Sequence, residues 1–246
     1  MNVLLLMAGP SDKYREAGQT YPKNLVEIAG QPIIQHVMEN VAPLVGAKDN
    51  LILVLNREEI QRFHTDSVAR LLAPKARICE AMGKTAGAAC SALLAIDKID
   101  NDEPLVVANG DQVILTNLPA AIADFNKRKL DGGIIVFEDV HPRWSFVKCN
   151  AQGLVVETAE KRPISRLATA GFYYFKRGKD FVRAAERMIL KDSQVDGAFF
   201  VCPTYNELLL ENARIGIFTI PRQNYFSMAT PPGAQLYAEH LKKKSR

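Results

Sequence analysis

The run Val3-Leu4-Leu5-Leu6-Met7-Ala8-Gly9 (residues 3–9), followed by a polar loop and by Tyr21-Pro22-Lys23, decides the fold of this chain. An apolar run that ends in a small residue and a glycine is typical of a buried strand that leads into a tight loop. A glycine there lets backbone N–H groups approach a phosphate, and a lysine farther along can supply positive charge. The stretch therefore predicts a strand whose carboxyl end meets an anionic ligand.

Strand-like and helix-like segments alternate after this opening. The expected strands of the first half are 3–7, 51–55, 77–80 and 105–108, and the expected helices are 33–45, 57–72, 85–96 and 118–129. Such alternation predicts a mainly parallel sheet with helices on both faces. Ligands of such sheets bind outside the carboxyl ends of the strands.

The pattern changes after residue 131. Strand-like runs separated by short turns follow at 132–138, 146–149, 154–157 and 170–176, and these favour antiparallel pairs added to the parallel half. Helices are expected at 179–190, 205–212 and 233–243, with a strand at 214–220. No repeat or linker divides the chain, so we expect one domain with two subregions.

Residues 7–37 (MAGPSDKYREAGQTYPKNLVEIAGQPIIQHV) resemble the N-terminal loop of the sugar-phosphate nucleotidylyltransferases, also called nucleotide-sugar pyrophosphorylases. The resemblance is strongest to the branch of bacterial capsule and surface-polysaccharide pathways. It implies a GT-A-like, Rossmann-like α/β fold and a single domain, 1–246. Residues 1–130 would bind the nucleotide, and residues 131–246 would bind the acceptor. The chain departs from the pattern at Pro10-Ser11-Asp12-Lys13, where the family has x-Gly-Ser-Arg.

Asn109-Gly110-Asp111-Gln112 follows the expected strand at 105–108. A carboxylate at that strand end can hold Mg²⁺ beside nucleotide phosphates, although acidic residues are also common in such turns. The family reads NxDQ or GDQ here, and the resemblance implies that Asp111 binds the metal. Near the C-terminus, Ser227 stands where the wider superfamily often has a second metal-binding aspartate, so a second carboxylate ligand stays open.

Two further motifs gain a role from the resemblance. Small residues around Gly87 open a helix, and from the residues alone they favour nucleotide contact and close helix–sheet packing equally. The family's T-x-G-A-A element implies that Gly87 contacts the nucleotide. The Glu160-Lys161 pair is by itself typical of a solvated turn. The resemblance implies that Glu160 accepts hydrogen bonds from acceptor hydroxyls and that Lys161 holds the acceptor phosphate.

The resemblance implies a reaction in which a sugar phosphate or similar phosphorylated acceptor attacks the α-phosphorus of an NTP and pyrophosphate leaves. Lys23 and Asp111, with Mg²⁺, would act at the reacting centre. Ala8, Gly9 and Lys13 would contact the nucleotide, with Lys13 replacing the usual arginine on the β- and γ-phosphates.

Two other function classes stay open. Pro10, Ser11 and Asp12 weaken the expected phosphate loop, which suits a non-catalytic nucleotide-binding or nucleotide-sugar-binding regulatory relative. A GT-A glycosyltransferase that uses an NDP-sugar donor is the other, although only Asn109-Gly110-Asp111 stands in place of its DxD motif.

Composition sets the remaining bounds. The 246 residues are 48% hydrophobic and 24% charged, an ordinary soluble composition, and the net charge of +4 lies largely in the tail 242–246. This charge indicates a solvated helix end, and we expect no nucleic-acid partner. The cysteines lack a CxxC pair, residues 4–9 (LLLMAG) are too short and wrongly flanked to indicate a signal peptide, and no 18-residue apolar run occurs. We therefore expect a cytoplasmic protein without membrane insertion. Homo-oligomerisation is left open.

Overall fold

Strand β1 (Asn2–Leu6) lies inside the parallel half of the central sheet. In this computed structural model, which describes residues 1–46 and 50–244, β1 pairs in parallel with β4 (Asn50–Asn56) and β6 (Leu105–Asn109). Beyond β4 lies β5 (Arg77–Ala81), also parallel. Ser245 and Arg246 of the basic tail fall outside the described residues.

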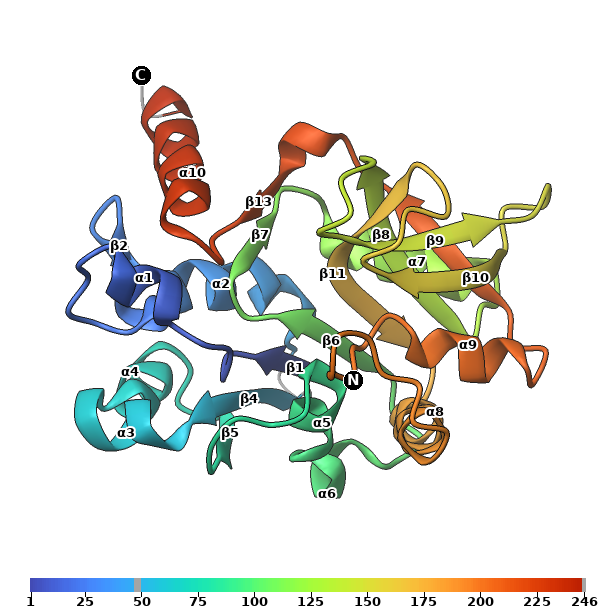
Figure 1. The fold of residues 1–246 in the computed structure, drawn as a ribbon, viewed down its shortest axis with the longest axis horizontal. Helices are drawn as coiled ribbons and strands as arrows, with labels where there is room; N and C mark the ends of the chain where they lie inside the picture. The colour runs from blue at the N-terminus through green and yellow to red at the C-terminus, as the bar shows by residue number, and fades with distance from the viewer. Residues whose placement is uncertain (47–49, 245–246) are drawn as a thin grey trace.

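The other half of the sheet is largely antiparallel. Strand β11 (Leu167–Phe175) pairs antiparallel with β6, β8 (Gly132–Glu138) and β9 (Ser145–Cys149). Strand β10 (Val155–Glu160) continues beyond β9, and β12 (Ile215–Thr219) runs parallel to β8 (Figure 1). The predicted α/β class, a parallel half with helices and an antiparallel extension, is confirmed.

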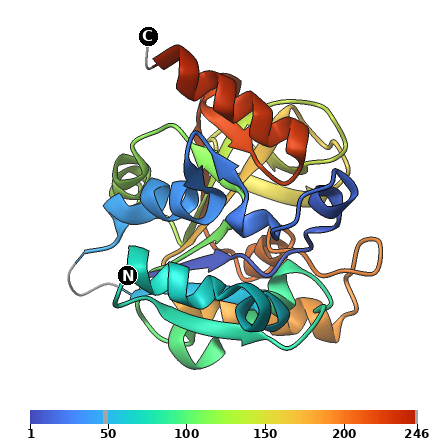
Figure 2. The same cartoon turned by 90° about the vertical axis from the view of Figure 1, so that its left-hand side faces the viewer.

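Two hydrophobic cores fill the two faces of the sheet. Val3 and Leu5 of β1 belong to one core and Leu4 to the other, because successive side chains of a strand point to opposite faces. Figures 1 and 2 show the helices on both sides. Helices with residues in the first core are α1 (Asp12–Glu16), α2 (Ile33–Val41), α4 (Thr65–Leu72), α7 (Leu118–Lys127) and α10 (Pro231–Lys244). Helices with residues in the second core are α5 (Ala88–Leu93), α6 (Ile96–Ile99), α8 (Gly178–Leu190) and α9 (Thr204–Leu209).

Several helix boundaries differ from the sequence expectation. The segment 57–72 forms two helices, α3 (Arg57–Phe63) and α4, because His64 adopts a left-handed conformation with φ 54°. Within the described segments, 1–46 and 50–244, no helix has both the length and the apolar character needed to cross a membrane.

The chain also contains short elements that the sequence did not predict. They are helix α1 (Asp12–Glu16), the 3-10 turns η1 (Lys23–Leu25) and η3 (Arg222–Asn224), the hairpin β2 (Glu27–Ile28) and β3 (Gln31–Pro32), and the pair β7 (Gln112–Ile114) and β13 (Tyr225–Ser227). The 3-10 turn η2 (Ala42–Leu44) follows α2 within the segment 33–45 that the sequence predicts as one helix. Strand β13 runs antiparallel to β7 and sets Ser227 opposite Gln112. This pairing brings the C-terminal region to the NGDQ turn.

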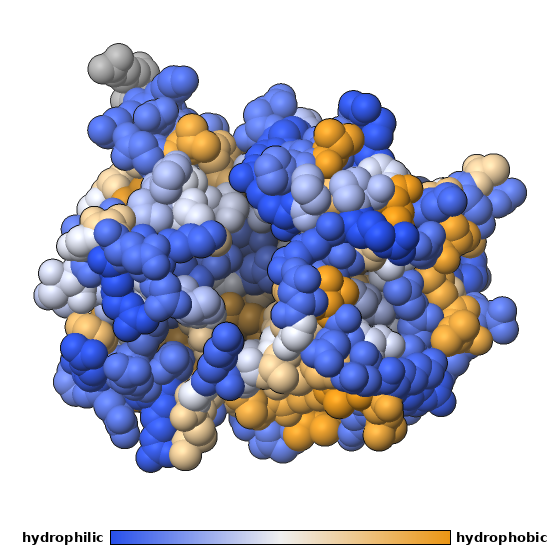
Figure 3. All heavy atoms as spheres, viewed as in Figure 1, coloured by the Kyte–Doolittle hydropathy of each residue, from blue (hydrophilic) through white to orange (hydrophobic). Residues whose placement is uncertain are grey.

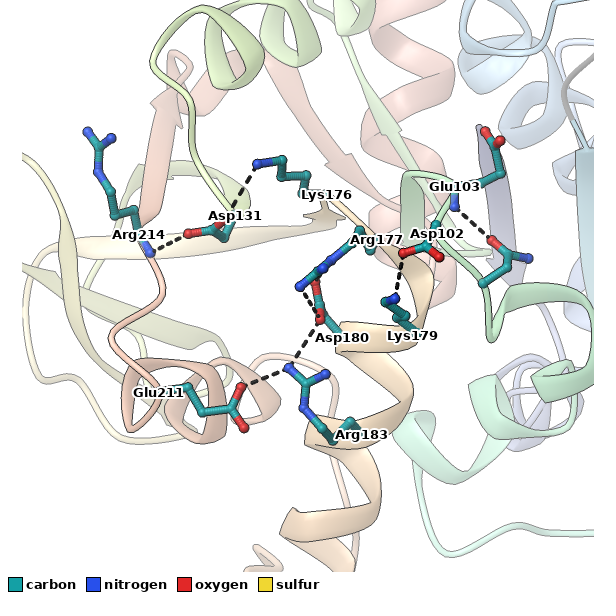
Figure 4. Close-up of polar contacts among 11 residues, drawn as sticks. Asp102, Glu103, Asp131, Lys176, Arg177, Lys179, Asp180, Arg183, Glu211 and Arg214 are labelled. Carbon is teal, nitrogen blue, oxygen red and sulfur yellow. Dashed lines mark hydrogen bonds and ion pairs between the residues drawn. The ribbon is translucent and has the colours of Figure 1, made fainter.

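A separate polar network surrounds the start of α8 (Figure 4). The carboxylate of Asp180, 7% exposed, accepts hydrogen bonds from Arg177 at 2.8 Å and is paired with Arg183 at 3.1 Å. Arg183 also pairs with Glu211, at 2.8 Å, just beyond α9. These contacts hold α8 against the end of α9, and Asp180 does not line the cavity described next.

Candidate functional site

A cavity of about 840 Å³ opens between the two halves of the sheet. One wall carries residues at the ends of β1 and β6, such as Ala8, Gly9 and Asp111, and the other carries residues of β9 to β11, such as Glu160. Figure 3 shows the molecular surface hollowed between these two halves. The cavity thus lies where an α/β sheet of this kind binds its ligands, outside the carboxyl ends of its parallel strands.

Lys23 and Asp111 meet in this cavity. The Lys23 Nζ donates to Asp111 Oδ2 at 2.6 Å, with side chains only 6% and 20% exposed. Asp111 reaches this position because Gly110 packs tightly against β1: a Cβ there would lie 2.6 Å from the Leu6 carbonyl oxygen. A Cβ on Gly9 would lie 3.4 Å from Lys23 Nζ, so the opening glycine also borders the pair.

The backbone of Asp111 is held by the C-terminal region. Its carbonyl accepts a hydrogen bond from Met228 N at 2.7 Å, and the Tyr14 hydroxyl donates to Met228 O at 2.8 Å. Burial, reinforced by the Asp111 charge, raises the pKa of Tyr14, so the phenol stays a donor. Ser227 lines the cavity beside this contact. It stands at the position where the wider superfamily often has a second metal-binding aspartate.

The donor set around Asp111 fits a metal only in part. Among residues 1–46 and 50–244, three or more His, Cys, Asp or Glu side chains nowhere gather in a metal-binding arrangement. Mg²⁺ commonly binds through one or two carboxylates, water and substrate phosphates. Asp111 can therefore hold such an ion together with a nucleotide, rather than as part of a site built by the protein alone.

A largely buried hydrogen-bond network that the sequence analysis missed adjoins Lys23, and two of its members, Ser11 and Glu59, also border the cavity. Glu59 accepts hydrogen bonds from Ser11 Oγ at 2.9 Å and from Asn24 Nδ2 at 3.0 Å. The backbone N–H of Lys23 donates to Ser11 Oγ at 3.0 Å. Burial raises the pKa of Glu59, while the bonds from Ser11 and Asn24 act in the opposite direction. Glu59 could not be identified from the sequence, because glutamate is common in the first turn of helices, where it interacts favourably with the helix dipole.

The opposite wall carries the predicted acceptor residues. Glu160 lines the cavity and accepts a hydrogen bond from Ser145 Oγ. Burial raises the pKa of Glu160, opposed by the Ser145 bond and by Lys161. Lys161 has φ 53°, and its Nζ lies 2.9 Å from Asp196 Oδ2. In the described part of the chain, Lys161 is not among the residues that line the cavity.

The cationic lining differs from the expected one. Lys13 is exposed on α1 and lies outside the set of described residues that line the cavity, whereas Arg15 of the same helix is inside it and pairs with Asp12. Lys84 and Arg143 also line the cavity. The Arg143 guanidinium carbon lies 4.2 Å from the centroid of the Trp144 ring. No ion pair involves Lys84 or Arg143 within residues 1–46 and 50–244, which leaves both cations available to a ligand.

Gly87 combines the two roles left open by the sequence. It lines the cavity, but its φ of +122° and a Cβ that would lie 2.4 Å from Phe199 O show that packing alone requires glycine. Ala89 N donates to the same Phe199 carbonyl at 3.0 Å. The glycine thus lets the start of α5 pack against the segment before α9, and residues on both sides of this contact line the cavity.

The Lys23–Asp111 pair thus lies in a cavity at the carboxyl ends of parallel strands, where open α/β sheets bind nucleotides and other ligands. The chain belongs to the nucleotidyl transferase family, whose pattern it matches over residues 2–196. The predicted membership of the sugar-phosphate nucleotidyltransferase family is thereby confirmed.

Named relatives agree with this family. The chain is 29% identical over 216 residues to the bifunctional protein GlmU of Methanocaldococcus jannaschii, covering 80% of this chain but only 48% of that protein. It is 29% identical over 181 residues to the UTP–glucose-1-phosphate uridylyltransferase AglF of Haloferax volcanii, covering 71% and 72% of the two chains. The chain thus spans about half of GlmU and most of AglF.

One solved structure covers nearly the whole chain. The nucleoside-diphosphate-sugar pyrophosphorylase of Vibrio cholerae superposes with a TM-score of 0.82 at 25% identity. The superposition covers 97% of this chain and 100% of that one. The similarity therefore extends over the antiparallel half of the sheet, beyond the residues 2–196 that the family pattern matches.

Proposed function

We propose that this protein is a nucleotidylyltransferase that joins an NTP to a sugar phosphate or a similar phosphorylated acceptor and releases pyrophosphate. The observation that carries the proposal is the Lys23–Asp111 pair at 2.6 Å, inside a cavity whose far wall presents Glu160. The names of its relatives support sugar phosphates as acceptors. We further propose one domain, 1–246, with the nucleotide in the half 1–130 and the acceptor in the half 131–246, and a role in surface-polysaccharide biosynthesis.

In the proposed reaction, a phosphate oxygen of the acceptor forms a bond to the α-phosphorus of the NTP. The bond between the α-phosphorus and the bridging oxygen breaks, and its electron pair leaves with pyrophosphate. Positioning and charge stabilisation supply most of the catalysis of such transfers. Lys23 would stabilise the negative charge that develops on the α-phosphate, and Asp111 would hold Lys23 in place until the substrate arrives.

Asp111 is also the proposed ligand of a divalent cation, Mg²⁺. When bound, this ion would neutralise phosphate charge and polarise the α-phosphate. Ala8 and Gly9 would let the nucleotide approach the end of β1, and Gly87 would border it at the start of α5. The prediction that Lys13 contacts the β- and γ-phosphates requires its side chain to turn inward, and Arg15 is the alternative that already lines the cavity.

On the acceptor side, Glu160 would accept hydrogen bonds from sugar hydroxyls. Lys161 could bind the acceptor phosphate only by leaving Asp196, to which it donates at 2.9 Å. Arg143 lines the same wall without a carboxylate partner among the described residues, and its planar guanidinium can bind a phosphate through two parallel hydrogen bonds. We therefore include Arg143 beside Lys161 as a candidate for the acceptor phosphate.

One observation favours a second candidate, a regulatory protein that binds nucleotides without turnover. The Ser11 hydroxyl is engaged by Glu59 and by Lys23 N, and Pro10 has no N–H, so the loop offers a phosphate fewer donors than the family pattern would. Purified protein with Mg²⁺, each of the four common NTPs and a panel of sugar phosphates distinguishes the two. Pyrophosphate release that requires both substrates supports the enzyme, whereas nucleotide binding without release supports the regulatory protein.

A further inference from the structure

Glu59 is a largely buried residue that, like Ser11, borders the cavity next to the loop that carries Lys23, and no step of the proposed reaction uses its carboxylate. Glu59 belongs to the first turn of α3, whose N-terminus is capped by the side chain of Asn56. Its two oxygens accept hydrogen bonds from Ser11, 48 positions away, and from Asn24, 35 positions away. One carboxylate thus connects two separate points of the segment between β1 and β2.

Ser11 and Asn24 each make a second hydrogen bond that fixes the backbone near Lys23. The Ser11 hydroxyl donates its proton to Glu59 and accepts the Lys23 backbone N–H at 3.0 Å. Asn24 Nδ2 donates one proton to Glu59 and the other to the Met7 carbonyl at 2.9 Å, at the end of β1. The backbone is therefore fixed at Lys23 itself and at the residue that follows it.

We propose that Glu59 is a positioning residue which, through Ser11 and Asn24, fixes the backbone of Lys23 so that its Nζ lies ready at Asp111 before substrate binds. The inference rests on the function proposed above, since it assigns a role within that reaction. It also explains Ser11 at a position where the family resemblance expects glycine. The hydroxyl here is an internal support for the loop rather than a ligand for phosphate, because both its proton and an acceptor site are used inside the protein.

The variant Glu59→Gln tests this role because its amide has one acceptor atom where the carboxylate has two. Its oxygen can accept from Ser11, but its NH₂ group then faces the Asn24 NH₂ group. Rotating the Asn24 amide would place Oδ1 against the Met7 carbonyl oxygen. If the new amide is turned over instead, its oxygen can accept from Asn24 and its NH₂ group can donate to Ser11 Oγ, but the Ser11 proton then loses its acceptor. In each arrangement one hydrogen bond of the network is lost or reversed, and the negative charge of the carboxylate is removed. We expect kcat to fall about 10- to 100-fold, the range for a misplaced catalytic group, while KM for the NTP changes less than about threefold.

Two further variants separate positioning from general destabilisation. Ser11→Ala removes the hydrogen bond to Lys23 N with a smaller change in the side chain, and it should also lower kcat. It therefore tests the positioning role even if Glu59→Gln does not fold. Asp180→Asn is the control, since it also alters a buried, hydrogen-bonded carboxylate, but one that lies outside the cavity that Glu59 borders (Figure 4). It should lower the melting temperature and leave kcat per folded molecule unchanged.

A measurement without turnover distinguishes this inference from the proposed function. NMR of protein labelled with ¹⁵N-lysine, with the signal assigned by Lys23→Arg, reports the Lys23 ammonium group directly. We expect Glu59→Gln and Ser11→Ala to shift or abolish that signal and Asp180→Asn to preserve it. An unchanged signal with unchanged kcat in both loop variants would overturn the positioning role. If the wild type transfers no nucleotide but the Lys23 signal still shifts in the two loop variants, the proposed function is wrong and the positioning role of Glu59 stands.

Discussion

Lys23 Nζ and Asp111 Oδ2 lie 2.6 Å apart although 88 positions separate the two residues in sequence. The contact joins the turn η1 to the loop between β6 and β7, so it depends on the parallel pairing of β1 with β6. Because Lys23 is nearly buried, its charge needs this partner in the absence of a ligand. An incoming phosphate can replace the carboxylate as partner, which is how the pair would respond to substrate.

Lys23→Ala should slow nucleotidyl transfer far more than it weakens NTP binding. The loss of one charge that stabilises the transition state costs about 2–4 kcal/mol in the barrier. Steady-state kinetics, with the melting temperature measured in parallel, checks this. Lys191→Ala is the control, since Lys191 also pairs with a largely buried carboxylate, Glu207, at 2.7 Å. If Lys23→Ala changes only the melting temperature, Lys23 has a packing role alone.

Gly87→Ala should destabilise the protein by about 1–3 kcal/mol, because it adds a Cβ against the Phe199 backbone at a left-handed φ of +122°. Gly83→Ala is the matched control in the same loop, since nothing lies within 4 Å of its added Cβ. Chemical denaturation of both variants gives the comparison. Equal stability of the two would show that Gly87 is free of the Phe199 contact and that any role it has is confined to the ligand.

Glu160→Gln should change how stability depends on pH. Burial raises the pKa of Glu160 above its ordinary value of 4.5, so ionising this group disfavours the folded state. The resulting penalty is absent below pH 4.5 and grows as pH rises from there to the folded-state pKa. The melting temperature of Glu160→Gln relative to wild type should therefore increase across that interval. A difference that is constant between about pH 4 and 8 would contradict a raised pKa.

Arg15 and Lys13 can be compared directly because they lie on the same short helix. Arg15→Ala should weaken NTP binding, measured by calorimetry, since Arg15 lines the cavity and a guanidinium bond to phosphate contributes about 1.5–3 kcal/mol. Lys13→Ala should leave the affinity nearly unchanged if Lys13 keeps its observed outward position. The reverse order would support the original prediction that Lys13 is the phosphate ligand and would require the loop to rearrange on binding.

The sheet could be predicted from the sequence because its signals are local. Apolar runs such as 3–7 and 105–108 became β1 and β6 to within a residue or two. The break at His64 and the short strand β13 could not be predicted, since a left-handed residue in an amphipathic run and a three-residue strand leave no periodic signal. Tertiary pairing alone stabilises them.

The residues of the candidate site likewise fall into those that the sequence predicted and those that it missed. Lys23 and Asp111 were assigned from motifs at strand ends, and the fold brings them together. Glu59 was missed because its role arises only when α3 packs against the loop of Ser11 and Asn24. Arg143 was missed because an exposed arginine in a turn looks solvated until the Trp144 ring fixes it beside the cavity. Contacts between distant segments define such residues, and spacing along one segment does not.

The most direct test of the account is ³¹P NMR of the wild-type protein and Asp111→Asn with Mg²⁺, an NTP and a sugar phosphate. The account predicts that the wild type produces a diphosphate linkage containing the α-phosphorus together with an equal amount of pyrophosphate, and that Asp111→Asn loses most of this activity while staying folded. Hydrolysis without a new diphosphate, or equal rates for the two proteins, would contradict the central role given to the Lys23–Asp111 pair.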